Sequence, residues 1–265
     1  MYNAIYNISG CGAVWLAQML WEHKVAGSNP ATPTIFMHIN FIRSLATGKS
    51  KAKLIELSKL TQSFCGVDLF VAYKSNFKND GYFVEFGAGD GIKASNTYIL
   101  EKGLNWKGLL IEPARSFHEV LKNNRSCNID YSCIAKESGN KVWFMEEDEE
   151  HKLYSHVFGY SGSNNFKYVD KYILETKSLN DVLDQYNAPH HIDFVSVDTK
   201  GGEYEILKSF DFSKRSVDIF CVDWTYSHNR NNTEMLDIAT FFRDNNYTQF
   251  VHKQHEGWFV RNKRD

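Results

Sequence analysis

The stretch YFVEFGAGDG, residues Tyr82–Gly91, joins a short apolar run to a turn rich in glycine. The apolar run is typical of a strand in a parallel sheet that is covered on both faces. Three of the last five residues are Gly87, Gly89 and Gly91. Glycines allow positive φ angles and let a ligand lie against bare main chain. With a helix expected over Ala94–Lys102, the order strand, glycine turn, helix predicts the start of a nucleotide-type binding site.

Strands and helices continue to alternate after this turn. Apolar runs predict strands at Gly108–Glu112, Asn128–Ile134, Lys141–Glu146, Tyr172–Lys177, Ile192–Val197 and Val217–Asp223. Helices are expected over Ser116–Asn123, Ser178–Tyr186, Gly202–Ser209 and Asn232–Asn245, and Ser178 is expected to cap the second of these. Alternation of this kind predicts an α/β fold with a mostly parallel sheet and helices on both faces. The closing pair Tyr247–His252 and Gly257–Arg261 predicts that the last strand inserts antiparallel.

The N-terminal part differs from this core. Residues 1–36 follow no helical or strand period, and Lys24–Phe36 includes Gly-Ser-Asn-Pro, which resembles a translated transfer-RNA gene. We expect a non-native or disordered extension with the true start at Met37, the alternative being a real irregular arm. Residues 37–78 are expected to be helical and to pack on the core, since Lys49–Phe64 is amphipathic and Leu69–Phe77 continues as a short helix. The domain of alternating strands and helices would then span residues 79–265.

Composition excludes several classes of function. The 265 residues carry a formal net charge of −2, so no global field favours nucleic acid or an anionic membrane. Five cysteines form no CxxC pair and the histidines no HExxH pattern, so we expect free thiols and no metal. No stretch reaches the ~20 apolar residues of a membrane span. These features favour a cytoplasmic protein with a small-molecule or glycan partner.

Acidic residues lie at the carboxyl ends of three predicted strands, where ligands bind in open α/β sheets. They are Glu85, Glu112 and Asp198. Glu112 lies some twenty residues after the glycine turn, which suits two adjacent ribose hydroxyls, because a carboxylate accepts both O–H groups. The alternative is a surface glutamate before the turn at Pro113.

The glycine spacing distinguishes between cofactors. Dinucleotide enzymes use GxGxxG, whereas this turn has Gly-x-Gly-x-Gly with Glu85 before it and Asp90 inside it. Two carboxylates repel a pyrophosphate and suit a cationic ligand such as S-adenosylmethionine. Either acid would hold the ligand ammonium or organise the turn. The remaining cofactor contacts are expected from Gly89 and Ala88 in the turn, from Pro113 after Glu112, and from Ser95, Asn96 and Thr97. Of the last three, Ser95 or Asn96 would cap the following helix.

A second constellation, DFVSVDTKGGEYEIL at Asp193–Leu207, places Asp198 where a methyl acceptor would meet the cofactor. Glu203 opens the next helix. Asp198 is the first candidate for a base that activates an acceptor hydroxyl, Glu203 the second, and His228 in the loop TYSHNRNN the third. Trp224, Tyr226, Tyr154 and Tyr160 are candidates for lining the acceptor pocket.

These blocks resemble the FkbM-type methyltransferase family, together with the Asn124-Arg125 and Cys133 stretch and the closing HEGWFV. The resemblance covers roughly residues 79–262. It implies a Rossmann-like class I methyltransferase with a seven-stranded sheet, which transfers methyl from S-adenosylmethionine, often to oxygen on sugars or macrolides. It also implies cofactor contacts at Glu85, Gly87, Asp90, Asn96 and Glu112, with Asp198 and Glu203 at the reaction centre.

Two positions depart from the family pattern. Lys200 stands where the family usually carries an acid, and Asp223 replaces the glutamate that usually ends the fifth strand. A charge reversal at Lys200 would reset acceptor preference or weaken activity. The alternatives are therefore a non-catalytic cofactor-binding or scaffold protein of the same fold and, disfavoured by the glycine spacing, a nicotinamide-dependent oxidoreductase.

Overall fold

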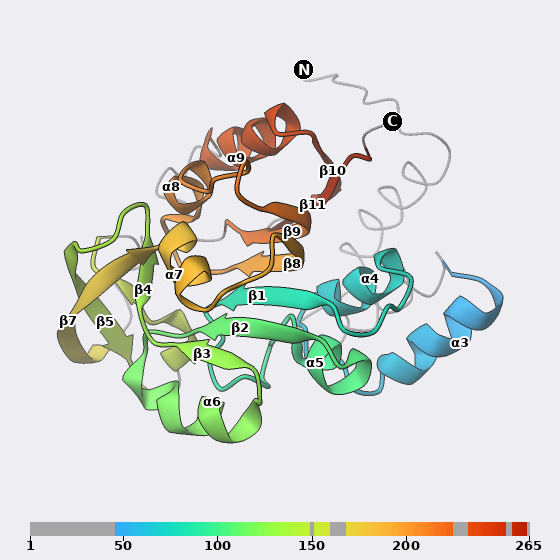
Figure 1. Ribbon diagram of the computed structural model, residues 1–265. Coiled ribbons are helices and arrows are strands. Elements are labelled where there is room, and N and C mark those ends of the chain that lie inside the picture. Colours follow the sequence, from blue (N-terminus) through green and yellow to red (C-terminus); the bar gives the residue numbers. More distant parts are fainter. Residues whose placement is uncertain (1–45, 149–150, 160–167, 225–232, 253–255, 264–265) are drawn as a thin grey trace, which may run out of the picture.

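The computed structural model describes residues 46–148, 151–159, 168–224, 233–252 and 256–263. Their main element is a seven-stranded sheet with the order β10-β11-β9-β8-β1-β2-β3 (Figure 1). The strands are β1 (Tyr82–Phe86), β2 (Lys107–Ile111), β3 (Asn128–Asp130), β8 (His191–Val197), β9 (Ser216–Asp223), β10 (Tyr247–His252) and β11 (Glu256–Arg261). Five neighbouring strands run parallel, namely β3, β2, β1, β8 and β9. Strand β11 inserts antiparallel between β9 and β10. The predicted α/β fold with a mostly parallel, seven-stranded sheet is confirmed.

Helices cover both faces of this sheet, as the continuous apolar strands require. One face packs against α3 (Gly48–Leu57), α4 (Val67–Lys74), α5 (Tyr98–Leu104) and α6 (His118–Asn124). The other packs against α7 (Leu179–Gln185), α8 (Glu203–Lys208) and α9 (Thr233–Asp244). Phe83 and Val84, neighbours on β1, belong to the two opposite cores and are fully buried.

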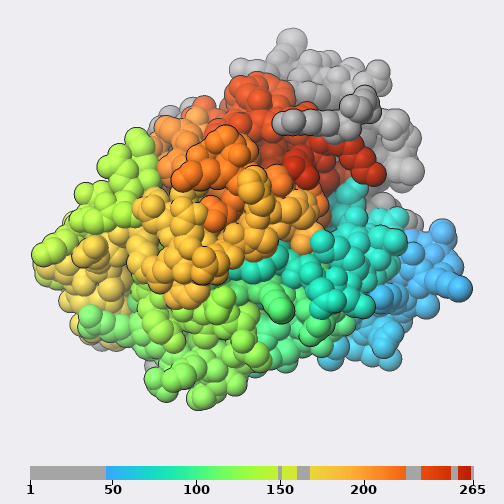
Figure 2. All heavy atoms as spheres, viewed as in Figure 1, coloured from blue at the N-terminus to red at the C-terminus, as the bar shows by residue number. Residues whose placement is uncertain are grey.

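A second, four-stranded sheet lies at the carboxyl ends of the parallel strands, with the order β4-β7-β5-β6. Its strands are β4 (Cys133–Ala135), β5 (Lys141–Glu147), β6 (His156–Val157) and β7 (Tyr168–Ser178). In the space-filling view it forms the yellow-green lobe beside the main body (Figure 2). The prediction of one strand over Asn128–Ile134 is wrong. Asp130 accepts a hydrogen bond from the Ser132 backbone N–H (2.7 Å), and this turn sends the chain from β3 in one sheet to β4 in the other.

The helix predicted to start at Ala94 begins four residues later, at Tyr98. Ala94 has a positive φ of 62°, which interrupts a helix. Thr97 is the N-cap, and its side chain makes no capping hydrogen bond because it bonds to Glu85 instead. The cap predicted at Ser178 is confirmed: its hydroxyl accepts from the Asp181 backbone N–H at 3.1 Å.

The described part of the N-terminal segment contains α3 and α4, and α3 ends at Leu57 rather than Phe64. The predictions for residues 1–36 and for a start at Met37 lie outside the described residues. Among the helices that are described, none combines the length and the apolar character needed to cross a bilayer.

Candidate active site

The glycine turn follows β1 at the centre of the sheet, and its glycines have the positive φ angles that the sequence predicts. A Cβ atom on Gly87 would lie 2.2 Å from the backbone oxygen of Asp198, at the end of the neighbouring strand β8. A Cβ on Gly91 would lie 2.6 Å from Arg125 Cγ. These two glycines therefore make room for protein atoms, and the turn is held close to the end of β8.

Glu85 is buried under this turn, at 3% exposure. Its Oε2 accepts hydrogen bonds from the hydroxyls of Ser95 (2.9 Å) and Thr97 (2.5 Å), and its Oε1 accepts from the backbone N–H of Asn96 (2.6 Å). Burial raises the pKa of Glu85, although the charge of Arg125 and these hydrogen bonds lower it in part. Of the two roles expected for Glu85, this geometry favours organisation of the turn.

Arg125 connects the segments around this carboxylate, and the sequence reasoning gave it no role. Its fully buried guanidinium lies 3.9 Å from Glu85 and 2.6 Å from Glu101. It also donates to the Gly91 carbonyl (3.0 Å) and to the hydroxyl of Thr97 (3.0 Å). The only signal for it in the sequence was its place in a family-like block, which does not say what a side chain contacts.

The other polar residues of the turn also bond within the protein. Asp90 Oδ1 accepts from the backbone N–H groups of Ile92 (2.8 Å) and Lys93 (2.7 Å). Asn96 donates to the Ser196 hydroxyl on β8 at 2.9 Å. Ala88 is buried, and its N–H donates to the Ile111 carbonyl at 3.3 Å. The loop that follows β1 is thus fixed by the chain itself.

Glu112 follows β2 and faces the glycine turn. Its Oε2 accepts from the Gly89 backbone N–H (2.7 Å), and its Oε1 accepts from the Ala114 N–H (2.8 Å). Each carboxylate oxygen has a second lone pair with which to accept a ligand hydroxyl. Burial raises the pKa of Glu112 to about 7; the two backbone hydrogen bonds oppose this rise, Glu146 adds to it, and Lys200 lowers it in part.

The second sheet holds the segment that follows Glu112. The hydroxyl of Tyr172 on β7 donates to Glu146 Oε2 (2.6 Å), and its oxygen lies 3.4 Å from the carbonyl oxygen of Pro113. Glu146 Oε1 accepts from the Ser116 backbone N–H at 2.8 Å. No local pattern predicts this support, because it joins residues that lie 26 to 59 positions apart.

Asp198 and Asp223 end the neighbouring strands β8 and β9, and Lys200 lies between them. The Lys200 ammonium is 2.5 Å from Asp198 Oδ1 and 3.1 Å from Asp223 Oδ2. Lys200 has a φ of +59°, which directs the loop so that its side chain reaches back to both acids. Burial alone would lower the pKa of Lys200, but the two carboxylates raise it above its usual value, so the ammonium stays charged.

Glu203, the second candidate base, is buried at the start of α8. Its Oε1 accepts from the backbone N–H groups of Thr199 and Gly201, both at 3.0 Å, and from the Thr199 hydroxyl at 3.0 Å. Burial raises the pKa of Glu203. This carboxylate therefore shapes the loop that carries Lys200.

Of the remaining predicted residues, His228, Tyr226 and Tyr160 lie outside the described part of the chain. Trp224 is 4% exposed, and its ring packs against Gly257, where an added Cβ atom would lie only 2.3 Å from the ring. Tyr154 is 39% exposed on the arm between β5 and β6, whose Leu153 packs on Gly89.

The polar residues of this site fit S-adenosylmethionine better than a pyrophosphate. Glu112 lies beside the glycine turn, and the Asp198–Lys200–Asp223 cluster lies on the next strands along the same edge. A carboxylate recognises ribose hydroxyls, and the cluster has more negative than positive charge, which favours a cationic ligand.

Comparison with known proteins agrees with this chemistry. Residues 85–248 match the model of the methyltransferase FkbM domain, which is more than half of the chain. No curated protein matches the chain. One similar solved structure is the precorrin-6y C5,15-methyltransferase of Geobacter metallireducens, at 11% identity and a TM-score of 0.40 over 82% of this chain and 94% of that one.

Two further structures are also named as methyltransferases. A Podospora anserina methyltransferase with SAH bound has 9% identity and a TM-score of 0.42 over 99% of this chain and 100% of that one. A putative RNA methyltransferase from Pyrococcus horikoshii has 11% identity and a TM-score of 0.38 over 82% and 99%. With the family match over most of the sheet and its site, the chain belongs to the FkbM methyltransferase family and is a methyltransferase that uses S-adenosylmethionine.

Proposed function

We propose that this methyltransferase modifies oxygen, on a hydroxyl of a sugar, a polysaccharide or a natural product. The observation that carries the proposal is the position of Asp198. Its carboxylate ends the strand next to the glycine turn, and Lys200 holds it at 2.5 Å. A neutral hydroxyl is a weak nucleophile, so a carboxylate that accepts its proton is the group such an acceptor needs.

Two residues of the chain, Glu112 and Asp198, have distinct roles in the proposed reaction. Bound S-adenosylmethionine would supply a methyl group on a sulfonium, a good leaving group. Glu112 accepts hydrogen bonds from the ribose hydroxyls and thereby orients the ligand in the site. Asp198 accepts the proton of the acceptor hydroxyl as its oxygen bonds to the methyl carbon and the carbon–sulfur bond breaks. Alignment of this kind is worth roughly 7–11 kcal/mol of the barrier.

The proposed acceptor is a small molecule or a glycan in the cytoplasm. The net charge of −2 supports this choice over nucleic acid, which basic surfaces attract.

The experiment is a methyl-transfer assay on a panel of mono- and oligosaccharides, with the product identified by mass spectrometry. Asp198→Ala should lower turnover by about 10²–10⁴-fold while binding of S-adenosylmethionine stays detectable by calorimetry. Asp130→Asn is the matched control, because Asp130 ends the nearby strand β3 and pairs with Lys177 at 2.9 Å. Full turnover in the Asp198→Ala protein would remove Asp198 from the mechanism.

A second candidate function rests on the same ion pair. Because the Lys200 ammonium occupies Asp198 Oδ1, the carboxylate has less capacity to take a proton. A protein with this arrangement would bind the cofactor and act as a scaffold. Calorimetric binding of S-adenosylmethionine without turnover on any hydroxylated acceptor would favour this candidate.

A further inference from the structure

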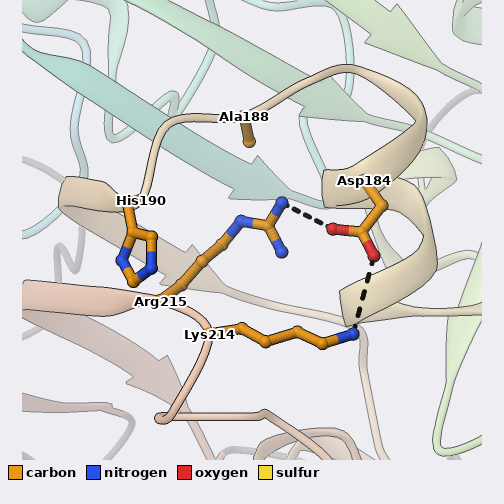
Figure 3. Close-up of a pocket in the computed structure, with 5 residues that line it drawn as sticks. All are labelled: Asp184, Ala188, His190, Lys214 and Arg215. Atoms are coloured by element: carbon orange, nitrogen blue, oxygen red, sulfur yellow. Dashed lines mark hydrogen bonds and ion pairs between the residues drawn. The ribbon is translucent and has the colours of Figure 1, made fainter.

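A cavity of about 280 Å³ lies at the opposite end of the parallel strands from the candidate active site. Its lining comes from the end of α7, the loop before β8 and the loop before β9, and consists of Asp184, Ala188, His190, Lys214 and Arg215 (Figure 3). The seven residues of β8 separate His190 from Asp198, a span of about 26 Å at ~3.3 Å per residue. The cavity therefore shares no side chain with the methyl-transfer site.

Arg215 is the central group of this cavity and is only 8% exposed. Its Nη2 donates to Asp184 Oδ1 at 2.6 Å, which ties the loop before β9 to α7. Its Nε is buried and has no hydrogen-bond partner in the described part of the chain. A buried N–H of a charged group needs an acceptor, so the ion pair with Asp184 accounts for only one side of the guanidinium.

The charges around the cavity favour an anion. Lys214 and Arg215 carry two positive charges, and Asp184 carries one negative charge. Lys214 Nζ is 3.9 Å from Asp184 Oδ2 and its side chain is 58% exposed, so it is loosely held and able to turn towards a ligand. In Figure 3 the guanidinium lies between His190 and Asp184, with the Lys214 chain alongside.

The volume of the cavity and the geometry of its two cationic side chains restrict the class of anion further. At ~30 Å³ per water, the cavity has the volume of about nine waters, which is at the small end for ligand pockets. A guanidinium beside an ammonium is the donor set that recognises phosphate, which offers several oxygens and two negative charges. We propose that this cavity binds a phosphate group, present as the free ion or carried by a small phosphate monoester, with the Arg215 guanidinium and Lys214 Nζ as donors.

The test is isothermal titration of the full chain in phosphate-free buffer at constant ionic strength. Two probes are used, inorganic phosphate and glycerol 3-phosphate. We expect saturable binding of at least one probe, and the tighter probe identifies the source of the phosphate group. Absence of saturable heat with both probes would overturn the proposal.

Three variants test the residues. Arg215→Lys keeps a charge near Asp184 but removes the planar guanidinium with its several N–H donors, and should weaken binding about tenfold or more. Lys214→Gln, at an exposed side chain that is safe for folding, should weaken it about threefold to tenfold. Asp184→Asn should strengthen binding, because it removes the competing carboxylate. Equal affinities in wild type, Lys214→Gln and Asp184→Asn would overturn the assignment, and unchanged binding of S-adenosylmethionine in Lys214→Gln keeps this test separate from the methyl-transfer site.

Discussion

The two halves of the candidate active site hold their acids in different ways. On the β1–β2 half, Glu85 and Glu112 are buried, and backbone N–H groups and hydroxyls bond to their oxygens. On the β8–β9 half, the ammonium of Lys200 forms ion pairs with both Asp198 and Asp223. The first half is fixed by backbone N–H groups, loop hydroxyls and the buried Arg125, whereas the second is arranged around the charge of Lys200.

This difference indicates which half of the site tolerates amino-acid substitutions. A change on the β1–β2 half disturbs the turn itself, because each carboxylate oxygen satisfies a backbone group or a loop hydroxyl. A change at Lys200 alters charge and acceptor chemistry and leaves the strands in place. We therefore expect stability and cofactor binding to respond to the first half, and turnover to respond to the second.

The largest effect should come from Arg125→Met. Removal of the guanidinium leaves Glu85 and Glu101 without their buried partner, which should lower the free energy of unfolding by about 3–5 kcal/mol. Urea denaturation followed by circular dichroism measures this loss. Lys102→Ala is the matched control, because Lys102 contacts the same Glu101 from the surface and should cost at most about 1 kcal/mol. Equal losses in the two variants would contradict the central role of Arg125.

Glu112→Gln tests the cofactor role of the fixed half. A hydrogen bond to a charged group is worth about 1.5–3 kcal/mol, so the Kd for S-adenosylmethionine should rise about 10- to 150-fold. Isothermal titration measures it, with Asp130→Asn as the control that keeps wild-type affinity. An unchanged Kd in Glu112→Gln would remove the ribose role.

Lys200→Gln separates the two candidate functions. If Lys200 positions Asp198, turnover should fall about tenfold while the Kd for S-adenosylmethionine at pH 8 changes by less than about threefold. If Lys200 suppresses Asp198, turnover should rise instead. A Kd change as large as that of Glu112→Gln would contradict the division of the site into two halves.

The pH dependence of binding should be the mildest effect. With a pKa of about 7, Glu112 is mostly protonated below that pH in the free protein, and ribose recognition uses the carboxylate. The ionised fraction falls from about 0.9 at pH 8 to about 0.1 at pH 6, so affinity should weaken about tenfold. The midpoint should move up in Lys200→Gln, because the charge of Lys200 lowers the pKa of Glu112. A flat profile in the wild type would contradict this ionisation.

Local patterns in the sequence were sufficient for the main sheet, because strand, turn and helix signals lie within a few residues of one another. The glycine turn, the cap at Ser178 and the antiparallel insertion of β11 follow from such signals. The second sheet could not be predicted from such local signals, because its strands pair with partners that are distant in the sequence. Its first strand, β4, is also separated from β3 only by the turn at Asp130.

The candidate site was predictable in position but not in contacts. Glu112 and Asp198 lie at strand ends, as the sequence indicated. The sequence does not reveal that Arg125 connects Glu85 to Glu101, or that a positive φ at Lys200 turns its ammonium towards Asp198. Such contacts depend on backbone conformation and on packing between distant segments, which no local pattern encodes.

The most direct test is a crystal structure of the complex with S-adenosylhomocysteine. The expected arrangement has the ribose hydroxyls about 2.5–3.0 Å from the Glu112 carboxylate, with the sulfur directed towards the Asp198–Lys200–Asp223 cluster. A ligand bound with its ribose away from Glu112, or with its sulfur on the far side of the glycine turn from Asp198, would contradict it.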